Sequence, residues 1–520
     1  MLQMSGNVPG GRSKTLANTG LLMRYSPYLQ LGLLALLAIV VYASTPFNYW
    51  VADDFNYVVP KGVDRVISFY DPTVPTRAFY RPLTWTTWAI DYWLWGKSSF
   101  GWHVSSVIFH AATTVMVALL VFRLFKSWGI ALAAGALFAV HPTHPETVTF
   151  IGGRADLICG LFYFAAVLFF VLYLQRRAAG RGTTRFYLLA LIMAVGAILS
   201  KEMGVTLPFV LLLTDLFFFS SPGRFLKVAD WRIRIVPHLP FLVLVAGYVL
   251  MRYYLVAAGI VTNTYIGPSL LEPQRLLDST ASNIMLYVGI WGGPGIAAGL
   301  PNLVKVLIVL LAVAGAVLVA RWLGRVGLYC LLLIAITQAP TFNLTALRWL
   351  YIPSFGICLL LALAVRKLVE TRSSERAAAP RVGFAVLSIL VLAWGFGVIY
   401  ENLMWYKSGE EARSILAQIT EKVPATTEPV TIYFAGAPYE YDGALLFNTG
   451  LAAGVSLTNE RRRIALHEME QPVPPDPIVI DALSDPPKLG PNPVFLGYKE
   501  GMVISYSSLS GLMQAHPLKR

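Results

Sequence analysis

The chain has 520 residues, of which 56% are hydrophobic and 13% are charged, and its formal net charge is +13. This composition excludes a soluble globular protein, because many segments approach the roughly 20 apolar residues that cross a bilayer as a helix. The basic residues stand in short clusters beside apolar segments, which is typical of cytoplasmic loops and lipid contacts rather than of a nucleic-acid surface. The sequence therefore predicts a polytopic α-helical membrane protein.

The N-terminal residues 1–25 are polar and predict a disordered cytoplasmic tail. The apolar run from Tyr28 to Val41 has the length of a signal-peptide core, but the many later spans favour an uncleaved first helix. A transmembrane domain is predicted over residues 26–400. Its eleven predicted spans are about 27–46, 103–122, 128–141, 156–174, 186–199, 204–219, 238–257, 302–320, 326–340, 349–365 and 383–400.

Clusters of Lys and Arg follow the second, fourth, sixth, eighth and tenth of these segments. Because such clusters mark the cytoplasmic side, the N-terminus is predicted inside and the C-terminus outside. Residues 281–300 are apolar but interrupted by Trp291-Gly-Gly-Pro294-Gly295. This segment must begin and end outside, so it predicts a re-entrant or interfacial helix buried against protein.

The first external loop, residues 47–101, opens with the adjacent carboxylates Asp53-Asp54 just beyond the first span. Adjacent acids at such a place also fit a solvated loop or a helix cap. Four aromatic residues farther along the loop fall on one face of a helix: Trp85, Trp88, Tyr92 and Trp95. We predict that this helix lies in the membrane interface and receives a lipid-borne substrate.

Residues 401–520 are rich in proline and carry short β-rich runs. They predict a small external α/β domain with a helical stretch near 443–455. The predicted strands are Val430–Phe434, Ile478–Ile480, Val494–Leu496 and Met502–Tyr506. The three cysteines, Cys159, Cys330 and Cys358, fall inside apolar segments and predict no disulfide framework.

Charged residues within or beside spans are costly in a membrane and therefore indicate function. Five such groups are assigned to the outer face: Asp53-Asp54, the Arg77 and Arg81 region, the loop from His141 to Asp156, Lys201-Glu202, and Arg348. A carboxylate that takes a proton from an acceptor hydroxyl, opposite cations that hold a departing phosphate, suits glycosyl transfer from a lipid phosphate. Arginine and lysine together suit the phosphate, since arginine binds it through two donors.

Structural alternatives remain open for these groups. His141 and His144 have a metal-like spacing, but the intervening proline and the lack of a thiolate favour hydrogen-bonded loop histidines. Arg154 and Asp156 can pair with each other, and Lys201-Glu202 can cap the fifth span. The sequence has no phosphate-binding glycine loop, zinc signature or hydrolase elbow.

Several motifs between about residues 45 and 370 resemble the transmembrane O-mannosyltransferases that target cadherins and their bacterial relatives, which are GT-C glycosyltransferases. The motifs are FYRPLTWTTWAIDYWLWG from residue 79, HPTHPE at 141–146 followed by GRAD at 153–156, LSKEMGVTLPFVLLLTDLFF at 199–218, and LRWLYIPSFGICLLLALAV at 347–365. Residues 430–455 look like the end domains of bacterial GT-C proteins whose acceptors are uncertain.

The resemblance implies a GT-C fold, a sugar donor on a polyprenyl or dolichyl monophosphate, and an inverting transfer that needs neither a metal nor another cofactor. It implies that Asp53-Asp54 are the acidic motif of the first external loop, and that mannose is the sugar. Two departures matter. The tetratricopeptide repeats of the family are absent, so the acceptor stays open among protein, lipid and glycan. The usual Glu-Arg pair is Leu347-Arg348 here, so that acid is missing.

The sequence thus predicts a glycosyltransferase in the membrane, expected to be a bacterial inner membrane, with no nucleic-acid partner. Asp53 and Asp54 are the predicted catalytic residues, with Asp53 as the general base. The predicted donor-phosphate and substrate-binding residues are Arg348, Lys201, Glu202, Arg154, Arg81, Arg77 and His144. The alternatives are a lipid-linked saccharide transporter or flippase, which should show an inverted repeat and mid-membrane polar groups, and a non-catalytic scaffold.

Overall fold

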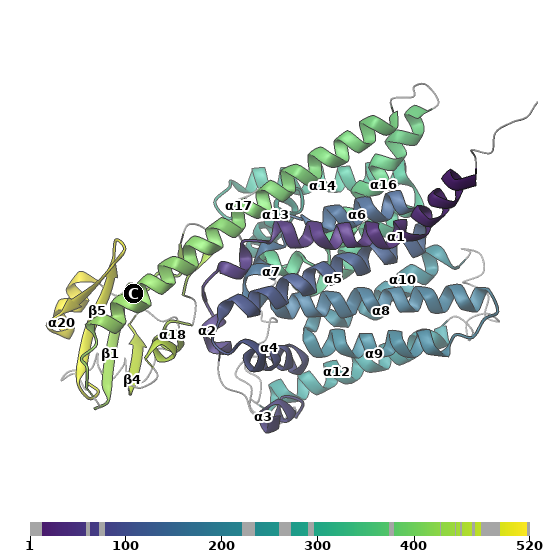
Figure 1. The fold of residues 1–520 in the computed structure, drawn as a ribbon. Coiled ribbons are helices and arrows are strands. Elements are labelled where there is room, and N and C mark those ends of the chain that lie inside the picture. The colour runs from purple at the N-terminus through teal and green to yellow at the C-terminus, as the bar shows by residue number, and fades with distance from the viewer. Residues whose placement is uncertain are drawn as a thin grey trace, which may run out of the picture.

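The computed structural model is a bundle of helices with a small β-sheet at one end (Figure 1). It describes residues 13–58, 63–71, 79–220, 235–258, 272–289, 296–373, 379–426, 428–441, 444–447, 450–459, 463–469 and 489–516. Each of the eleven predicted apolar segments coincides with a helix. These helices are α1 (Ser13–Val41), α5 (Ser99–Phe125), α6 (Trp128–Ala139), α8 (Arg154–Ala178), α9 (Thr184–Ser200), α10 (Leu207–Phe218), α12 (Leu239–Ala257), α14 (Asn302–Leu323), α15 (Arg325–Gln338), α16 (Ser354–Ser373) and α17 (Ala379–Lys422).

Within the described ranges, six helices are long and apolar enough to cross a bilayer, which confirms a polytopic helical membrane protein. They run over Pro27–Phe47, Ser99–Phe125, Ile151–Ala178, Val236–Ala257, Asn302–Leu323 and Arg381–Lys422. The helices α6 and α10 have 12 residues each. At about 1.5 Å per residue they extend roughly 18 Å, less than the roughly 30 Å hydrocarbon core. The count of eleven full crossings therefore stays a prediction.

Burial separates inner from outer helices. In α8, 78% of the most apolar window is buried, whereas in α14 only 6% is buried. A helix that is apolar all round and buried lies inside a bundle, and one that stays exposed faces lipid. Helix α8 is therefore the central helix, and its first residue Arg154 stands at the end of the bundle that carries the loops described next.

The first loop forms three short helices, α2 (Asp54–Tyr57), α3 (Val63–Ser68) and α4 (Pro82–Trp95). Helix α4 confirms the predicted aromatic helix, and its aromatic face is only partly turned into the protein. The Trp88 ring is buried and stacks on Tyr57 with 3.9 Å between ring centroids. Trp95, at the end of the same face, is exposed, as are Ile90, Trp93 and Leu94.

Two boundaries differ from the predictions. Helix α1 begins at Ser13, within the stretch predicted to be disordered. Helix α17 continues without a break from Ala379 to Lys422, so the predicted domain boundary at residue 400 lies inside one helix. The predicted interfacial segment begins earlier, as α13 (Pro273–Tyr287), and its Trp291–Gly295 core lies outside the described residues.

The C-terminal part forms a four-stranded sheet in the order β4-β1-β5-β6. Its strands are β1 (Val430–Ala435), β4 (Ile464–Glu468), β5 (Pro493–Lys499) and β6 (Met502–Tyr506). Strand β1 is parallel to β4 and β5, with Ile432 opposite Leu466 and Val494, and β6 is antiparallel to β5. Three of these strands were predicted and β4 was missed. The strand predicted at Ile478–Ile480 lies outside the described residues.

A hairpin and a helix connect β1 to β4. The hairpin pairs β2 (Glu440–Tyr441) with β3 (Ala444–Leu445), and the helix is α18 (Leu451–Thr458). Within the predicted 443–455 helix, the described residues 444–447 and 450 are therefore strand and loop, and residues 451–455 are helical. The last turns of α17 pack on one sheet face together with α18, while α20 (Leu509–Ala515) packs on the other. We call residues 428–516 the C-terminal domain; it lies at the same end of the bundle as α2 and α4 (Figure 1).

Candidate functional site

The two acids of the first loop have different surroundings. Asp54 is fully buried, and its carboxylate accepts hydrogen bonds from the backbone N–H of Val51 at 3.3 Å and of Gly152 at 3.1 Å. Burial raises the pKa of Asp54 well above its ordinary value, although both N–H groups oppose the rise. Asp53 is only half buried, at the N-cap of α2. The accessible acid is therefore Asp53, while Asp54 fastens the loop to the start of α8.

Both the acids and the basic residues act electrostatically on Tyr57. Burial raises its pKa above the ordinary value, Asp53 and Asp54 raise it further, and Arg81 and Arg348 oppose them. All four side chains thus lie within electrostatic range of one phenol. The structure thus brings residues that are up to 295 positions apart in the chain near one phenol.

Arg81 precedes α4 and binds Glu202 through two nitrogens, with Nη2 at 2.8 Å and Nε at 3.2 Å from Oε2. Arg252 of α12 donates to the other oxygen of Glu202 at 3.0 Å. Burial alone would raise the pKa of Glu202, but Arg81 and Arg252 outweigh it and lower the pKa to about 2. Glu202 is consequently a permanent anion that holds two guanidinium groups beside each other.

Lys201, next to Glu202, is almost fully buried and pairs with Asp156 of α8. Burial lowers the pKa of Lys201 to about 8; Asp156 opposes this, and Arg81 and Arg348 lower it further. Lys201 is therefore within electrostatic range of both arginines, and all three cations belong to one charged cluster with their carboxylate partners.

Arg348 lies in a single 3₁₀ turn, Leu347–Leu350, and pairs with Glu146 of α7 (Pro145–Thr149). The backbone N–H of Arg348 also donates to Glu146 at 3.1 Å. The Arg348 side chain keeps 26% of its surface exposed, the largest share among the predicted basic site residues that the structure describes. The acid that the sequence lacks beside Arg348 is thus supplied by the HPTHPE motif.

Arg154 lies in the interior of the protein, unlike Arg348. It is fully buried, pairs with Asp91 of α4, and donates to Ser106 at 3.1 Å, while Ser105 donates to the other oxygen of Asp91 at 2.7 Å. The suggested pairing of Arg154 with Asp156 is wrong, because each has another partner. The reason is that α4 folds back over the start of α8. Arg154 fixes α4 to the bundle and does not reach the surface.

The histidines of the HPTHPE motif are also enclosed. His144 is fully buried, and its Nε2 lies 2.8 Å from Ser354 Oγ. Burial lowers the pKa of His144 well below its ordinary value and that of His141 to about 3. Neutral, buried rings cannot attract a phosphate. Their geometry agrees with the alternative of hydrogen-bonded loop histidines.

Arg77 lies outside the described residues. Among the residues that the structure describes, no three His, Cys, Asp or Glu side chains come together as metal ligands, and metal independence stays a prediction. The sequence interpretation did not assign Glu146, Asp91 or Arg252 to the site. Arg252 carried a usable signal, since it is a charge within an apolar span.

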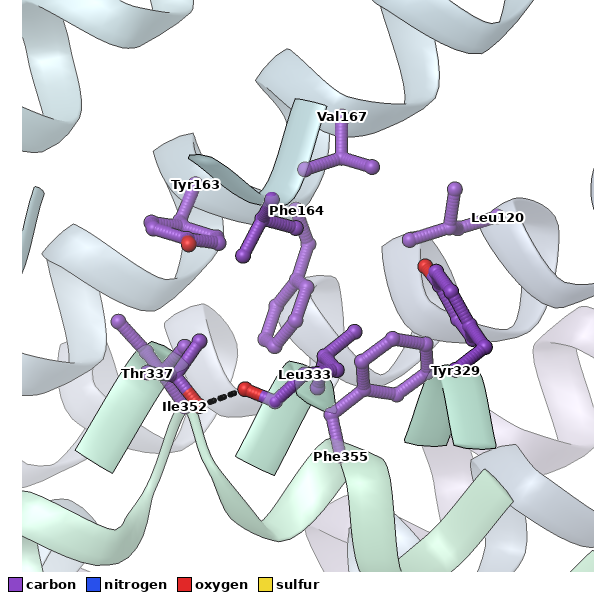
Figure 2. A pocket seen from close by; sticks show the side chains of 10 residues that line it. Leu120, Tyr163, Phe164, Val167, Tyr329, Leu333, Thr337, Ile352 and Phe355 are labelled. Atoms are coloured by element: carbon purple, nitrogen blue, oxygen red, sulfur yellow. Dashed lines mark hydrogen bonds between the residues drawn. The ribbon is translucent and has the colours of Figure 1, made fainter. Parts of the chain in front are cut away.

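A cavity lies within the bundle, and none of the charged residues described above lines it (Figure 2). Its lining comes from α5, α8, α10, α15 and α16 and consists of Leu120, Tyr163, Phe164, Val167, Val210, Tyr329, Leu333, Thr337, Ile352 and Phe355. Its Thr337 hydroxyl donates to the Leu333 carbonyl at 2.7 Å, and its Tyr163 and Tyr329 hydroxyls pair with Thr206 and Thr214.

Comparison with known proteins confirms the resemblance to O-mannosyltransferases. Protein O-mannosyl-transferase TMTC3 of Mus musculus is 26% identical over 409 residues, which cover 70% of this chain and 42% of that protein. Protein O-mannosyl-transferase TMTC1 of Mus musculus is 35% identical over 144 residues, which cover 26% of this chain and 15% of that protein. The chain thus spans less than half the length of these curated relatives. No family model matches the chain.

Two solved structures match this chain at low TM-scores. The archaeal oligosaccharyltransferase AglB of Archaeoglobus fulgidus, in complex with an inhibitory peptide and a dolichol-phosphate, has a TM-score of 0.46 at 14% identity over 85% of this chain and 64% of that chain. ArnT of Cupriavidus metallidurans, bound to undecaprenyl phosphate, has a TM-score of 0.39 at 14% identity over 93% and 99%. The similar curated proteins carry transferase names, so the transporter alternative is not favoured.

Proposed function

We propose that this chain is an inverting glycosyltransferase of the GT-C type. It would move a sugar from a polyprenyl-phosphate donor to an acceptor on the outer face of the membrane. Two lines support the proposal: the sequence similarity to protein O-mannosyl-transferases, and an accessible carboxylate beside a crowded group of cations. Mannose is the sugar that the similarity favours. The acceptor is a hydroxyl compound whose class, protein, lipid or glycan, is left open.

In the proposed reaction Asp53 accepts the proton of the acceptor hydroxyl as its oxygen attacks the anomeric carbon. The bond between that carbon and the phosphate oxygen breaks from the opposite side, so the configuration at the carbon inverts. Polyprenyl phosphate leaves with the bonding electron pair. Arg348, Arg81 and Arg252 are placed to stabilise its growing negative charge.

The observation that carries the proposal is the crowding of like charge. After burial, Arg81 and Arg348 both lower the pKa of Lys201, and each of the three cations also has a carboxylate partner. A preorganised group of cations of this kind stabilises negative charge that develops in the transition state. A phosphate leaving group is such a charge.

The test is transfer of radiolabelled sugar from a synthetic polyprenyl-phosphate sugar by the purified chain in detergent. Mannosyl and glucosyl donors are compared, each with a mixture of protein, lipid or glycan acceptors. Labelled product that depends on Asp53 supports the proposal. The proposal is wrong if, with every donor, the purified chain hydrolyses and transfers no more sugar than heat-inactivated protein does.

The outer-face orientation is tested by labelling single cysteines with an impermeant maleimide in intact cells. Asn56 in α2 and Glu440 in β2 are both exposed, and the three native cysteines are buried and add little background. We expect Asn56→Cys and Glu440→Cys to react without permeabilisation. If either reacts only after permeabilisation, the proposed topology is wrong.

A further inference from the structure

The C-terminal domain touches the acid loop directly. The backbone N–H of Ala52 donates a hydrogen bond to the carbonyl of Leu446 at 2.7 Å, and Leu446 N–H donates to Tyr439 at 2.9 Å. This ladder attaches the residue before Asp53 to the β2–β3 hairpin. Beside it, the ring of Phe55 packs on Phe447 with 6.0 Å between ring centroids. The acid pair therefore stands between two anchored residues, Ala52 and Phe55.

The backbone of the acid loop needs such an anchor. Ala52 has a φ of +49°, in the left-handed region that a residue with a Cβ rarely adopts. A non-glycine residue stays in this region only where its surroundings hold it there. The described contacts of Ala52 include the Leu446 carbonyl and the start of α18, and Ala52 has no exposed surface. The local sequence around Ala52 does not by itself favour this left-handed backbone conformation.

The start of α18 packs tightly against the acid loop. A Cβ added to Gly450 would lie 1.7 Å from the carbonyl oxygen of Ala52 and 3.0 Å from the Phe55 ring. Gly450 has φ −95° and ψ −11°, so its backbone is open to any residue. Glycine is thus needed at this position only because the acid loop passes so close. Gly454, one turn later, faces Phe55 at 3.3 Å.

We infer that the C-terminal domain is a positioning element of the reaction, which acts through Ala52 and Phe55 to set the direction of the Asp53 carboxylate. This inference rests on the proposed function. Leu446, Phe447 and Gly450 are positioning residues, not catalytic ones, because they contact the loop rather than the reacting atoms. The C-terminal domain is thus attached to the bundle at two places, through the last turns of α17 and through the acid loop.

Three glycine-to-alanine variants in the full chain test the inference. Gly450→Ala forces the Ala52 carbonyl to move by more than 1 Å, because a Cβ contact shorter than 3.0 Å cannot persist. A displacement of about 1 Å at a reacting group costs about 100-fold in rate, so we expect that loss in kcat. Gly454→Ala meets only flexible side chains at 3.1 and 3.3 Å and should cost a few-fold. In α20, a Cβ added to Gly511 would be in ordinary van der Waals contact with the Ser508 hydroxyl at 3.5 Å, so Gly511→Ala is the matched control.

The decisive readout is the split between turnover and donor binding. A positioning role predicts a low kcat for Gly450→Ala with an unchanged Kd for polyprenyl phosphate and an unfolding temperature close to that of Gly454→Ala. If kcat, donor affinity and unfolding temperature fall together, the contact is structural only and the inference fails. Phe447→Leu, which keeps an apolar contact to Phe55, is a second variant in case Gly450→Ala does not fold; it should also lower kcat alone.

Asp53→Asn in the same assay separates this inference from the proposed function. If Asp53→Asn is inactive while Gly450→Ala turns over normally, the positioning inference is wrong and the proposed function stands. If both variants keep full turnover, Asp53 is not the base and the positioning inference is wrong, whereas the proposed function fails only if the unaltered chain transfers no sugar.

Discussion

Two arginine–carboxylate pairs of this protein use the same chemistry in opposite surroundings. Arg154 and Asp91 are sealed between α4 and α8, with side-chain exposures of 0% and 4%. Arg348 and Glu146 lie at the edge of the charged cluster, where the guanidinium keeps 26% of its surface. Both arginines were predicted to bind the donor phosphate, and only one of them has a surface with which to do so.

The difference teaches that burial decides what an ion pair can be used for. The charges of a sealed pair have lost their hydration and contact only protein. Such a pair therefore serves to hold two helices in one relative position. In a pair at an edge the arginine keeps surface in contact with water, so Arg348 can contact a second anion while it stays paired with the buried Glu146. The same reasoning separates Asp54, whose two oxygens bind backbone N–H groups, from Asp53, which is half exposed.

The largest expected effect separates the two acids. Asp53→Asn removes the proton acceptor, and general-base catalysis contributes about 10²- to 10⁴-fold. We therefore expect turnover to fall by that factor, while the Kd for polyprenyl phosphate, measured by isothermal titration, stays within twofold.

Asp54→Asn is the matched comparison for this prediction. It places an amide group where an oxygen accepts from a backbone N–H, which leaves a buried donor unsatisfied and costs about 1–3 kcal/mol of stability. Its main effect should be a lower unfolding temperature. A dead Asp54→Asn beside an active Asp53→Asn would reverse the two roles.

The next largest effect concerns the sealed pair. Arg154→Met leaves Asp91 buried without its cation, and breaking a buried pair in this way costs about 3–5 kcal/mol. We expect a marked fall in the unfolding temperature in detergent, with normal donor affinity in the fraction that remains folded.

The control is the double variant Arg154→Met/Asp91→Leu, in which neither charge remains. Replacing both partners by apolar groups is often neutral, so most of the stability should return. A double variant that is stable yet unable to bind polyprenyl phosphate would place Arg154 in the binding site after all.

For the exposed pair the expected loss is in affinity. Arg348→Ala should weaken binding of polyprenyl phosphate by about 1.5–3 kcal/mol, the usual worth of a hydrogen bond to a charged group. Arg366→Ala is the matched control, because Arg366 forms an exposed pair with Glu370 at the other end of α16. Unchanged affinity in Arg348→Ala would remove this residue from the site.

The sequence predicted those features that depend on local pattern and missed those that depend on packing. The helices were visible because each is a long apolar run, and the charged groups because a charge beside a span is costly. The partner of Arg154 was not visible, since Asp91 is 63 positions away and only the fold of α4 over α8 brings them together.

The C-terminal domain shows the same limit. Strand β1 is buried along its whole length and reads as apolar, whereas β4 has the sequence IALHE and ends in two polar residues. Only three apolar residues remain in β4, which is too short a run to mark a strand. The contact between Gly450 and Ala52 joins two loops that have no pattern at all, so no local signal announces it.

The smallest expected effect is a pH dependence that distinguishes the enclosed lysine from the exposed arginines. In the folded protein the pKa of Lys201 is lowered from 10.5 to about 8, first by burial. Lys201 is therefore charged below about pH 8 and loses its proton above it, well before any arginine does. If the charged form holds the donor phosphate, the Kd for polyprenyl phosphate should be constant from pH 6.5 to 8 and then rise by up to about tenfold per pH unit. The phosphate itself does not change charge in that window, because its second pKa is about 6. Lys201→Arg keeps the charge at every pH and should bind with a constant Kd up to pH 10. A wild-type Kd that stays constant above pH 8, like that of Lys201→Arg, would show that Lys201 serves only to hold Asp156 and that the arginines bind the phosphate without it.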